Sequence, residues 1–378
     1  MRMKILHVAS FSGNIGDNAS HKGLYHLLNK FFKNYTVKQL EMRNFYQNYQ
    51  GPSKKHFDED FVSYANDFDL VIIGGGGFLD YWVPNSASGT TIDIQPKLIH
   101  KLKCPTLITS VGCAPHKTIP DGNIDKFRHF LDAALENSKI LIAVRNDGSV
   151  DSIRRDIGSQ YLEHIPEVAD HGFFFKIKER IITYTPNKYI AINISEDQLA
   201  MESLHRGNID SHVFYDEISK TCKYICENLG LSVVFVPHIY TDLNAISSIL
   251  SRLSDHLIRE KISVAPCIQG RRSVDHIFGI YKHSKMVIAT RLHANICSLA
   301  MNIPVLGVAV LDRVKYVYDS LNLSSKCVIP SENFSQELND ELNFHNNQNL
   351  IAYNFDQLSL KKNETILVYN NFIEKEFS

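Results

Sequence analysis

The chain has 378 residues, of which 44% are hydrophobic, and 40 lysines and arginines against 41 aspartates and glutamates give a net charge of −1. This length fits two domains of ordinary size with a sizeable core. The balanced charge excludes a general basic field for nucleic acid and an acidic tail, so anion recognition must rest on a few placed residues.

The cysteine pattern and the hydropathy of the chain indicate a reducing compartment. Seven cysteines are scattered without the paired spacing of a disulfide framework. The N-terminal residues form no signal-peptide pattern, and no apolar run approaches the roughly 18 residues of a membrane span. We therefore expect a cytoplasmic protein without a transmembrane segment, peripheral at the inner face of the membrane if its substrate is lipid-linked.

Short apolar runs and longer amphipathic runs alternate along the chain, which is typical of parallel sheets in an α/β fold. The predicted strands are Lys4–Ser10, Leu70–Ile73, Thr106–Val111, Ile140–Val144, Tyr189–Ile194, Ser232–Val236, Met286–Ala289 and Pro304–Val308. The predicted helices are Ala19–Phe32, Phe127–Asn137, Val213–Asn228, Val274–His283 and Ala294–Met301.

A break in this alternation predicts two Rossmann-like domains. The charged stretch 176–188 separates an N-terminal domain at residues 1–178 from a C-terminal domain at residues 186–340. A helical pattern at residues 355–378 is expected to pack back on the N-terminal domain. Open α/β sheets bind ligands beyond the carboxyl ends of their strands, so we expect the two parallel sheets to face a cleft that holds the site.

A glycine-containing loop follows the first predicted strand. Gly13, Asn14 and Gly16 allow a tight turn close to a ligand, and Asp17 or Asn18 can cap the helix that follows. The helix amides would then favour an anion. The loop lacks the G-x-G-x-x-G pattern and the Walker A lysine, and a glycine turn with a capping aspartate explains it equally well.

Four consecutive glycines, Gly74, Gly75, Gly76 and Gly77, follow the strand at residues 70–73. Each glycine gives up more chain entropy on folding than any other residue would. A turn that only joins two elements rarely needs four of them. We interpret the run as a backbone that passes very near a ligand or a neighbouring loop.

Arg145 ends the strand predicted at residues 140–144 and is expected to point toward the cleft. A guanidinium there can bind a carboxylate or a phosphate. A structural ion pair with Asp147 or Asp151 is an equally good explanation.

The strongest feature is the junction after the strand predicted at residues 286–289. Arg291 offers a fork of donors for a carboxylate or phosphate, and His293 can donate a proton near neutral pH. Both stand where a helix begins, and free backbone amides favour an anion there. The coupling of the two residues favours a functional role over a structural histidine.

These pieces, taken in order, resemble the polysaccharide pyruvyl transferases of bacterial capsule, exopolysaccharide and cell-wall polymer synthesis. The matching pieces are Gly13-Asn14-Ile15-Gly16-Asp17, residues 69–77, Val144-Arg145-Asn146, Val168-Ala169-Asp170, Arg291-Leu292-His293-Ala294, Ile303-Pro304-Val305, and Asp312 with Lys315. They run from residue 13 to about residue 315, and the piece from Arg291 to Ala294 is the most specific.

The resemblance implies two domains like those of the glycosyltransferases called GT-B, with phosphoenolpyruvate as donor substrate and no further cofactor. It implies that a pyruvate ketal forms on two hydroxyls of a sugar in a cell-surface polysaccharide or its precursor, a lipid-linked oligosaccharide among the options. His293 and Asp17 are the catalytic candidates. The candidate substrate-binding residues are Arg291, Leu292, Arg145, Lys315, Gly13, Asn14, Gly16, Gly75, Gly76, Gly77 and Asp170. The family usually has an aspartate directly after the arginine, where this chain has Asn146.

Two other interpretations remain open from the sequence. A GT-B glycosyltransferase with a nucleotide-sugar donor would share the fold. A scaffold protein that has lost its activity would keep the fold without turnover, although the pair of Arg291 and His293 disfavours it. The base that takes the sugar proton is open among Asp17, Asp80 and Asp170. No zinc-binding spacing occurs, so no metal site is predicted.

Overall fold

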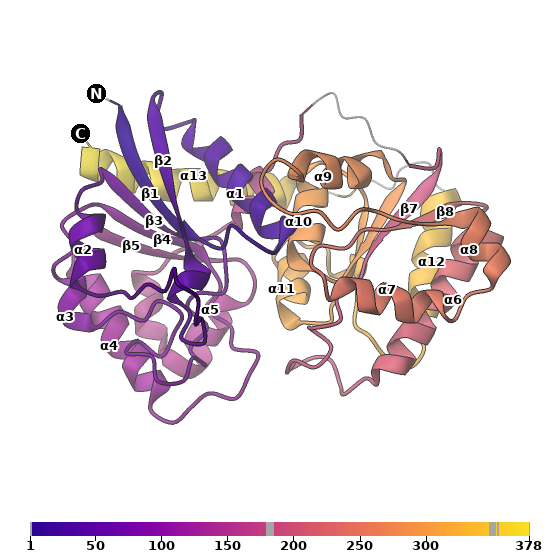
Figure 1. The fold of residues 1–378 in the computed structure, drawn as a ribbon, viewed down its shortest axis with the longest axis horizontal. Coiled ribbons are helices and arrows are strands. Elements are labelled where there is room, and N and C mark those ends of the chain that lie inside the picture. Colours follow the sequence, from indigo (N-terminus) through magenta and orange to yellow (C-terminus); the bar gives the residue numbers. More distant parts are fainter. Residues whose placement is uncertain (1, 179–184, 348–352, 354, 378) are drawn as a thin grey trace. The chain divides into compact units, whose positions relative to one another are not determined.

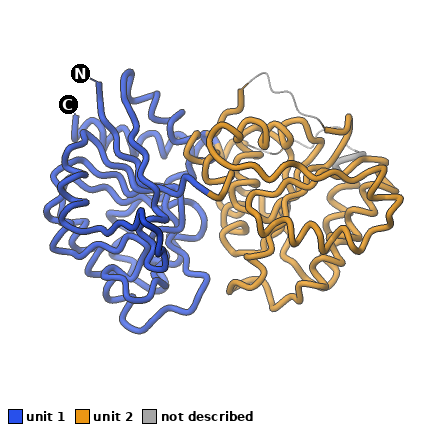
Figure 2. Tube along the Cα trace, in the orientation of Figure 1, with its two compact units in different colours: residues 1–12, 23–174, 359–378 blue, residues 13–22, 175–358 orange. Residues whose placement is uncertain are grey.

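A computed structural model of the chain describes residues 2–178, 185–347, 353 and 355–377 (Figure 1). The chain divides into two compact units, coloured separately in Figure 2. Unit 1 comprises residues 1–12, 23–174 and 359–378, and unit 2 comprises residues 13–22 and 175–358. Each unit is an α/β structure with its own parallel sheet.

In unit 1 the described residues form a parallel sheet of six strands in the order β2-β1-β3-β4-β5-β6. Its strands are β1 (Met3–Ala9), β2 (Tyr35–Glu41), β3 (Leu70–Gly74), β4 (Thr106–Val111), β5 (Ile140–Arg145) and β6 (Glu167–Val168). Successive side chains of a strand point to opposite faces. On β1, Leu6 and Val8 belong to one apolar cluster, whereas Ile5 belongs to another that includes Phe372. Both faces of this sheet are therefore covered, as expected for a parallel sheet.

The helices of unit 1 complete these two cores. They are α1 (Ile15–Leu28), whose first turns lie in unit 2, α2 (Glu59–Ala65), α3 (Pro96–Ile99), α4 (Asn123–Glu136), α5 (Ser149–Ser152) and α13 (Asp356–Phe377), with the short turns η1 (Met42–Phe45), η2 (Ile153–Ile157), η3 (Ser159–Glu163) and η4 (His171–Phe174). Tyr369 of α13 lies at hydrogen-bond distance from Thr109 of β4 and, at 2.8 Å, from Nε2 of His171. These polar contacts fix α13 against the sheet of unit 1.

In unit 2 the described residues form a second parallel sheet of six strands, in the order β12-β11-β10-β7-β8-β9. Its strands are β7 (Tyr189–Asn193), β8 (Ser232–Phe235), β9 (Ile262–Val264), β10 (Met286–Ala289), β11 (Val305–Val308) and β12 (Cys327–Val328). Numbered within the unit and read from the other edge, this order is 3-2-1-4-5-6, that of a dinucleotide-binding Rossmann sheet. The order reverses between β7 and β10.

The helices of unit 2 are α6 (Ser211–Glu227), α7 (Asp242–Leu250), α8 (Asp255–Lys261), α9 (Val274–His283), α10 (Leu292–Ala300), α11 (Asp312–Ser320) and α12 (Phe334–Asn347), with the short turn η5 (Ser324–Lys326). One apolar core joins α6, α7, α8 and α12 to alternate residues of the sheet, such as Ile192 and Phe235. α10 packs against β10, β11 and its neighbours α9 and α11. No helix in the described part of the chain is long and apolar enough to cross a membrane.

The boundaries of the two units differ from those of the expected domains, and one difference moves the candidate residue Asp17 into unit 2. Residues 13–22 belong to unit 2 rather than to the N-terminal domain, because the start of α1 packs on residues of unit 2 such as His238. Unit 2 also continues beyond residue 340, to Leu358. Of the linker expected at residues 176–188, residues 179–184 lie outside the described residues.

Candidate active site

The candidate site of unit 2 begins where the strand order reverses. In open α/β sheets a ligand binds at this reversal, outside the carboxyl ends of the strands. β7 ends at Asn193 and β10 ends at Ala289, and the two strands pair directly. Arg291 and His293 follow β10, so the strongest sequence motif stands at the position where the topology places a ligand.

Asn193 holds the ends of three strands together. Its backbone carbonyl accepts a hydrogen bond from Thr290 N at 3.0 Å, and its Oδ1 accepts one from Arg291 N at 3.1 Å. Its Nδ2 donates to the carbonyl of Val236, beyond β8, at 2.9 Å. Arg291 is therefore fixed at its backbone, where it is the N-cap residue of α10.

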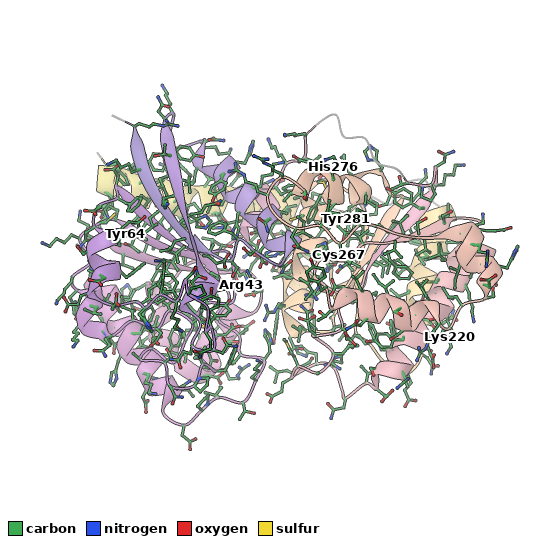
Figure 3. All side chains as sticks on the ribbon, in the orientation of Figure 1. Arg43, Tyr64, Lys220, Cys267, His276 and Tyr281 are labelled. Atoms are coloured by element: carbon green, nitrogen blue, oxygen red, sulfur yellow. The ribbon has the colours of Figure 1, made fainter. Side chains whose placement is uncertain are left out.

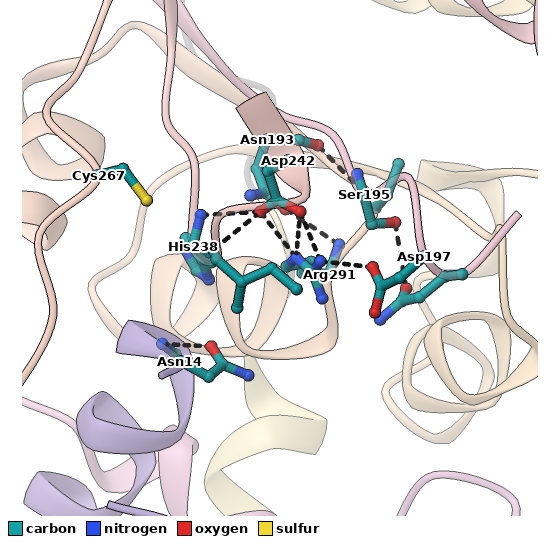
Figure 4. A network of polar contacts seen from close by, with 12 residues as sticks. Asn14, Asn193, Ser195, Asp197, His238, Asp242, Cys267 and Arg291 are labelled. Carbon is teal, nitrogen blue, oxygen red and sulfur yellow. Dashed lines mark hydrogen bonds and ion pairs between the residues drawn. The ribbon is translucent and has the colours of Figure 1, made fainter. Parts of the chain in front are cut away.

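The guanidinium of Arg291 lies between two carboxylates (Figure 4). Nε donates to Oδ2 of Asp242 at 2.9 Å, and Nη2 donates to Oδ1 of Asp197 at 2.6 Å. Burial lowers the pKa of Arg291, but the hydrogen bond and charge of Asp242, with those of Asp197, outweigh burial and raise it. The side chain thus keeps its positive charge at every physiological pH, and Asp242 fixes the direction of its fork.

His238 and Tyr281 extend this network into the core of unit 2. His238 is fully buried and its Nε2 lies 2.8 Å from the hydroxyl of Tyr281, which is labelled in Figure 3. Burial and the nearby charges of Arg291 and His293 lower the pKa of His238 well below its ordinary value. The ring is therefore neutral at pH 7. Its backbone N–H donates to Oδ2 of Asp242 at 2.8 Å, which ties it to Arg291.

The first turn of α1 is the second wall of this site. The helix begins at Ile15, four residues before the predicted start, so Asp17 and Asn18 lie inside its first turn and do not cap it. Asn14 takes the capping role, because its Oδ1 accepts a hydrogen bond from Gly16 N at 2.9 Å. Ile15 N also donates to the carbonyl of His238, at 3.4 Å. Capping by Asn14 leaves the carboxylate of Asp17 for a contact with His293.

Asp17 and His293 lie side by side, with 3.2 Å between Oδ1 of Asp17 and Nδ1 of His293. Nδ2 of Asn14 donates to the same oxygen of Asp17 at 3.1 Å. A Cβ atom on Gly16 would lie 2.9 Å from Cβ of His293 and 3.0 Å from Nδ1 of His238. Glycine at position 16 therefore permits the close approach that brings the two catalytic candidates together.

The glycine run after β3 lies beside the loop that follows β4 in unit 1. The order of this sheet reverses between β1 and β3, so the run stands at the reversal of unit 1. Gly112 N donates to the carbonyl of Gly76 at 2.9 Å, and a Cβ on Gly112 would lie 3.2 Å from Cα of Gly77. Gly75 has a positive φ of 82°, which favours glycine. The neighbouring-loop explanation thus accounts for part of the run.

Arg145 lies against this loop and is buried with two carboxylates. Its Nε donates to Oδ2 of Asp147 at 2.5 Å, and its Nη1 lies 3.5 Å from Oδ2 of Asp170. A Cβ on Gly112 would lie 2.8 Å from its Nη2. Burial lowers the pKa of Arg145, and the charges of Asp147 and Asp170 together outweigh burial and raise it. The structural ion pair with Asp147 is therefore present, whereas Asp151 pairs with Arg154.

The sequence-predicted residues thus fall into two clusters, one in each unit. Unit 1 brings together Arg145, Asp170 and the glycine run, and unit 2 brings together Asn14, Gly16, Asp17, Arg291 and His293.

Three other predicted residues have more local surroundings. Gly13, with a φ of 78°, has no atom within 4 Å of its Cβ position. Leu292 is buried in the first turn of α10. Lys315 of α11 pairs with Asp319 one turn along, which raises its pKa. Within the described residues, no group of three His, Cys, Asp or Glu side chains is arranged to hold a metal ion.

The sequence of the chain matches the family model described as polysaccharide pyruvyl transferase over residues 14–312. The chain belongs to the polysaccharide pyruvyl transferase family. The matched range contains both clusters, with every predicted site residue except Gly13 and Lys315. A search of curated proteins found no match to the chain.

Solved structures similar to this pyruvyl transferase family member include UDP-GlcNAc 2-epimerases and a protein solved with UDP. A UDP-GlcNAc 2-epimerase from Methanocaldococcus jannaschii has a TM-score of 0.55 at 11% identity, covering 97% of this chain and 100% of that chain. The Neisseria meningitidis enzyme of that name, bound to UDP-GlcNAc, has a TM-score of 0.52 at 12% identity over 98% and 100%. The S. aureus MnaA–UDP structure has a TM-score of 0.52 at 12% identity over 92% and 88%. At these identities the likeness shows the GT-B-like fold alone.

Four functional candidates were not among the predicted site residues. From the sequence, Asp242 could equally face the site or cap a helix, and in the structure it binds Arg291. Asp197, His238 and Tyr281 join the same network although they lie between 10 and 94 residues from Arg291 in sequence. Only the positions of Asp197 and His238 shortly after predicted strands gave a signal for them.

Proposed function

We propose that this member of the family transfers the pyruvyl group of phosphoenolpyruvate to two hydroxyls of a sugar in a cell-surface polysaccharide or its precursor. The observation that carries the proposal is the pair of Arg291 and His293 at the reversal of the unit 2 sheet, with Asp17 against His293. The donor is the only activated group required, so no further cofactor enters the proposed reaction.

Arg291 is assigned to the anionic donor. Phosphoenolpyruvate carries a carboxylate and a phosphate, and a guanidinium at a helix N-terminus favours either group. Asp242 and Asp197 hold Nε and Nη2 of Arg291, and no hydrogen bond to its Nη1 occurs among the described residues. We therefore propose that Nη1 of Arg291 and the first backbone amides of α10 bind the donor. Arg145 and Lys315 remain proposed as further donor ligands.

His293 is assigned as general acid and Asp17 as its positioning partner. Because Nδ1 faces Asp17 at 3.2 Å, the proton comes from Nε2 on the other side of the ring. Protonation of the methylene carbon makes the adjacent carbon electrophilic, one sugar hydroxyl attacks it, and the C–O bond to phosphate breaks. The second hydroxyl then closes the ketal. One hydroxyl proton returns to Nε2 of His293, and the other leaves with phosphate.

A thermal-shift titration of the full chain tests donor binding. Phosphoenolpyruvate is expected to raise the melting temperature, because a ligand that binds only the folded state stabilises it by mass action. UDP, GDP and CMP are titrated in parallel. A shift with a nucleotide and none with phosphoenolpyruvate would replace the proposal with a nucleotide-sugar glycosyltransferase.

Two variants separate binding from chemistry. His293→Ala is expected to lower turnover by about 10²–10⁴-fold, the usual contribution of a positioned general acid, while the phosphoenolpyruvate shift persists. Arg291→Lys is expected to reduce that shift, because it keeps the buried charge beside Asp242 but loses the fork. His276→Ala, at an exposed histidine of α9 labelled in Figure 3, is the matched control and is expected to change neither quantity. Normal turnover by His293→Ala contradicts the general-acid assignment.

A further inference from the structure

A pocket of about 370 Å³ lies in unit 1. It lies between the residues after η1 and the loop that follows the glycine run. Its lining includes Trp82, Lys117, Gln47, Thr91 and Asp93, and it also includes Gly77. Since Gly77 adjoins Gly112, which in turn lies against Arg145, the pocket stands next to the cluster at the reversal of the unit 1 sheet.

Trp82 is the single tryptophan of the chain and lines this pocket together with Phe45, Tyr46 and Phe78. Nζ of Lys117 lies over its ring, 4.2 Å from the centroid. The face of an indole ring carries negative charge and attracts groups with positive or partly positive hydrogens. The C–H groups on one face of a pyranose ring are such hydrogens, so the indole offers a stacking platform for a sugar.

Beside its apolar residues, the pocket has side chains that offer both donors and acceptors. Asp93 supplies carboxylate oxygens, whereas Lys117 and Gln47 supply N–H groups and Thr91 supplies a hydroxyl. A sugar hydroxyl both donates and accepts, so a ring rich in hydroxyls can satisfy this mixture. A purely apolar ligand would instead strip water from Asp93 and Lys117 without replacing it, which is costly.

The walls of the pocket are fixed by hydrogen bonds within unit 1. Nδ2 of Asn123, on α4, donates to the carbonyls of Tyr81 at 3.1 Å and Val83 at 3.0 Å, on both sides of Trp82. Asp93 accepts hydrogen bonds from Gln47 Nε2 at 3.0 Å and from Ala87 N at 2.6 Å. A preformed pocket loses little entropy when it binds its ligand.

We propose that this pocket binds a sugar ring of the acceptor, stacked on Trp82, with its hydroxyls bonded to Lys117 and Asp93. The assignment rests on the proposed pyruvyl transfer, for which a sugar must be held. It gives unit 1 a part in acceptor recognition, and Gly77 is the one predicted site residue that lines this pocket.

Because Trp82 is the single tryptophan, the intrinsic tryptophan fluorescence of the full chain reports on this pocket alone. The experiment titrates the protein with methyl glycosides of glucose, galactose, mannose, N-acetylglucosamine and N-acetylmannosamine. At least one glycoside is expected to change the emission of Trp82 in a saturable way. No saturable change with any of the five overturns the proposal.

Two variants that keep Trp82 locate the effect. Lys117→Ala is expected to lower the affinity for the glycoside that binds by about 3- to 10-fold, which is the effect of losing one hydrogen bond. Tyr64→Ala removes an exposed aromatic of α2, labelled in Figure 3, that is outside this pocket, and it is expected to leave the affinity unchanged. Equal affinities in both variants and the wild type overturn the assignment of the pocket.

Binding of phosphoenolpyruvate is measured independently of glycoside binding. The proposed function and the proposed sugar pocket can therefore be contradicted independently. Trp82→Ala is expected to keep the phosphoenolpyruvate-induced thermal shift and to raise the KM for acceptor with little change in kcat. Saturable quenching by a glycoside without any phosphoenolpyruvate-induced thermal shift would support the sugar pocket and contradict phosphoenolpyruvate as the donor. A phosphoenolpyruvate-induced thermal shift without any glycoside-induced change in fluorescence would support phosphoenolpyruvate as the donor and contradict the sugar pocket.

Discussion

Arg291 has two carboxylate partners that differ in their exposure to water. The side chain of Asp242 is fully buried, whereas that of Asp197 is 33% exposed. A charge that is removed from water must be compensated in place, while an exposed partner can be replaced by water. The two aspartates therefore have different energetic roles although both contact the same guanidinium.

Asp242→Ala is expected to lower the free energy of unfolding by about 3–5 kcal/mol, because it leaves the buried charge of Arg291 without its main partner. Asp197→Ala, the matched control, is expected to cost no more than about 1 kcal/mol, since water reaches that carboxylate. Urea unfolding of the full chain measures both values. Equal losses in the two variants would mean that burial does not distinguish the partners.

The sequence predicted single residues of the site better than the contacts between residues that are distant in sequence. Arg291 and His293 were identified because they follow a strand directly and open a helix, which is a local signal. The partnership of Arg291 with Asp242, 49 residues earlier, depends on which strands become neighbours. Asp17 was assigned as a possible cap because the predicted helix began too late, and the cap is Asn14. Long-range pairs of this kind have no periodicity in the sequence.

Among the elements, the eight predicted strands correspond to β1, β3, β4, β5, β7, β8, β10 and β11. These strands have largely buried residues, so their apolar runs are continuous. The strands that escaped prediction are β2, β6, β9 and β12, which are the edge strands of the two sheets. An edge strand is half solvated and short or polar, as in the exposed Lys38 and Gln39 of β2, so its pattern resembles that of a loop.

Gly74 ends β3 at an irregular point of the sheet. β4 shifts register between Thr109 and Val111, and Ser110 between them has a φ of 50°. A Cβ on Gly74 would lie 1.9 Å from the backbone carbonyl oxygen of Thr109. This position therefore requires glycine for packing between strands, independently of any ligand.

Gly74→Ala is expected to destabilise the protein by about 1–3 kcal/mol or more, because a backbone atom must move to admit the methyl group. Gly207→Ala is the matched control, since no atom lies within 4 Å of its Cβ position and its φ is not positive. The control is expected to change stability by less than about 0.5 kcal/mol. Thermal and urea unfolding compare the two, and a Gly74→Ala protein as stable as the wild type would show that the strand ends relax freely.

The stability of the whole molecule is expected to fall at both ends of the pH scale. In the unfolded chain His238 takes up a proton near its ordinary pKa of about 6.5, whereas burial prevents this in the folded protein. Acidification below about pH 6.5 therefore favours unfolding. Burial also raises the pKa of Cys104 and of Cys327 to about 12, so the unfolded state releases these protons first as the pH rises.

His238→Gln is expected to flatten the acid side of this profile, because glutamine takes up no proton in either state. His276→Gln, at an exposed histidine, is expected to leave the profile unchanged. Urea unfolding between about pH 5 and pH 8 measures both variants against the wild type. If the free energy of unfolding falls equally at acidic pH in His238→Gln and in the wild type, His238 is not the cause of that fall.

The fixing of α13 to unit 1 bears on how the protein is synthesised. Phe372 of α13 belongs to the apolar cluster that covers one face of the unit 1 sheet, and this helix is made after all of unit 2. Domains usually fold in the order in which they leave the ribosome. Here the sheet whose strands emerge first keeps part of an apolar face uncovered until α13 has been made. During that interval the nascent chain is expected to need a chaperone, and unit 2 has the time to fold first.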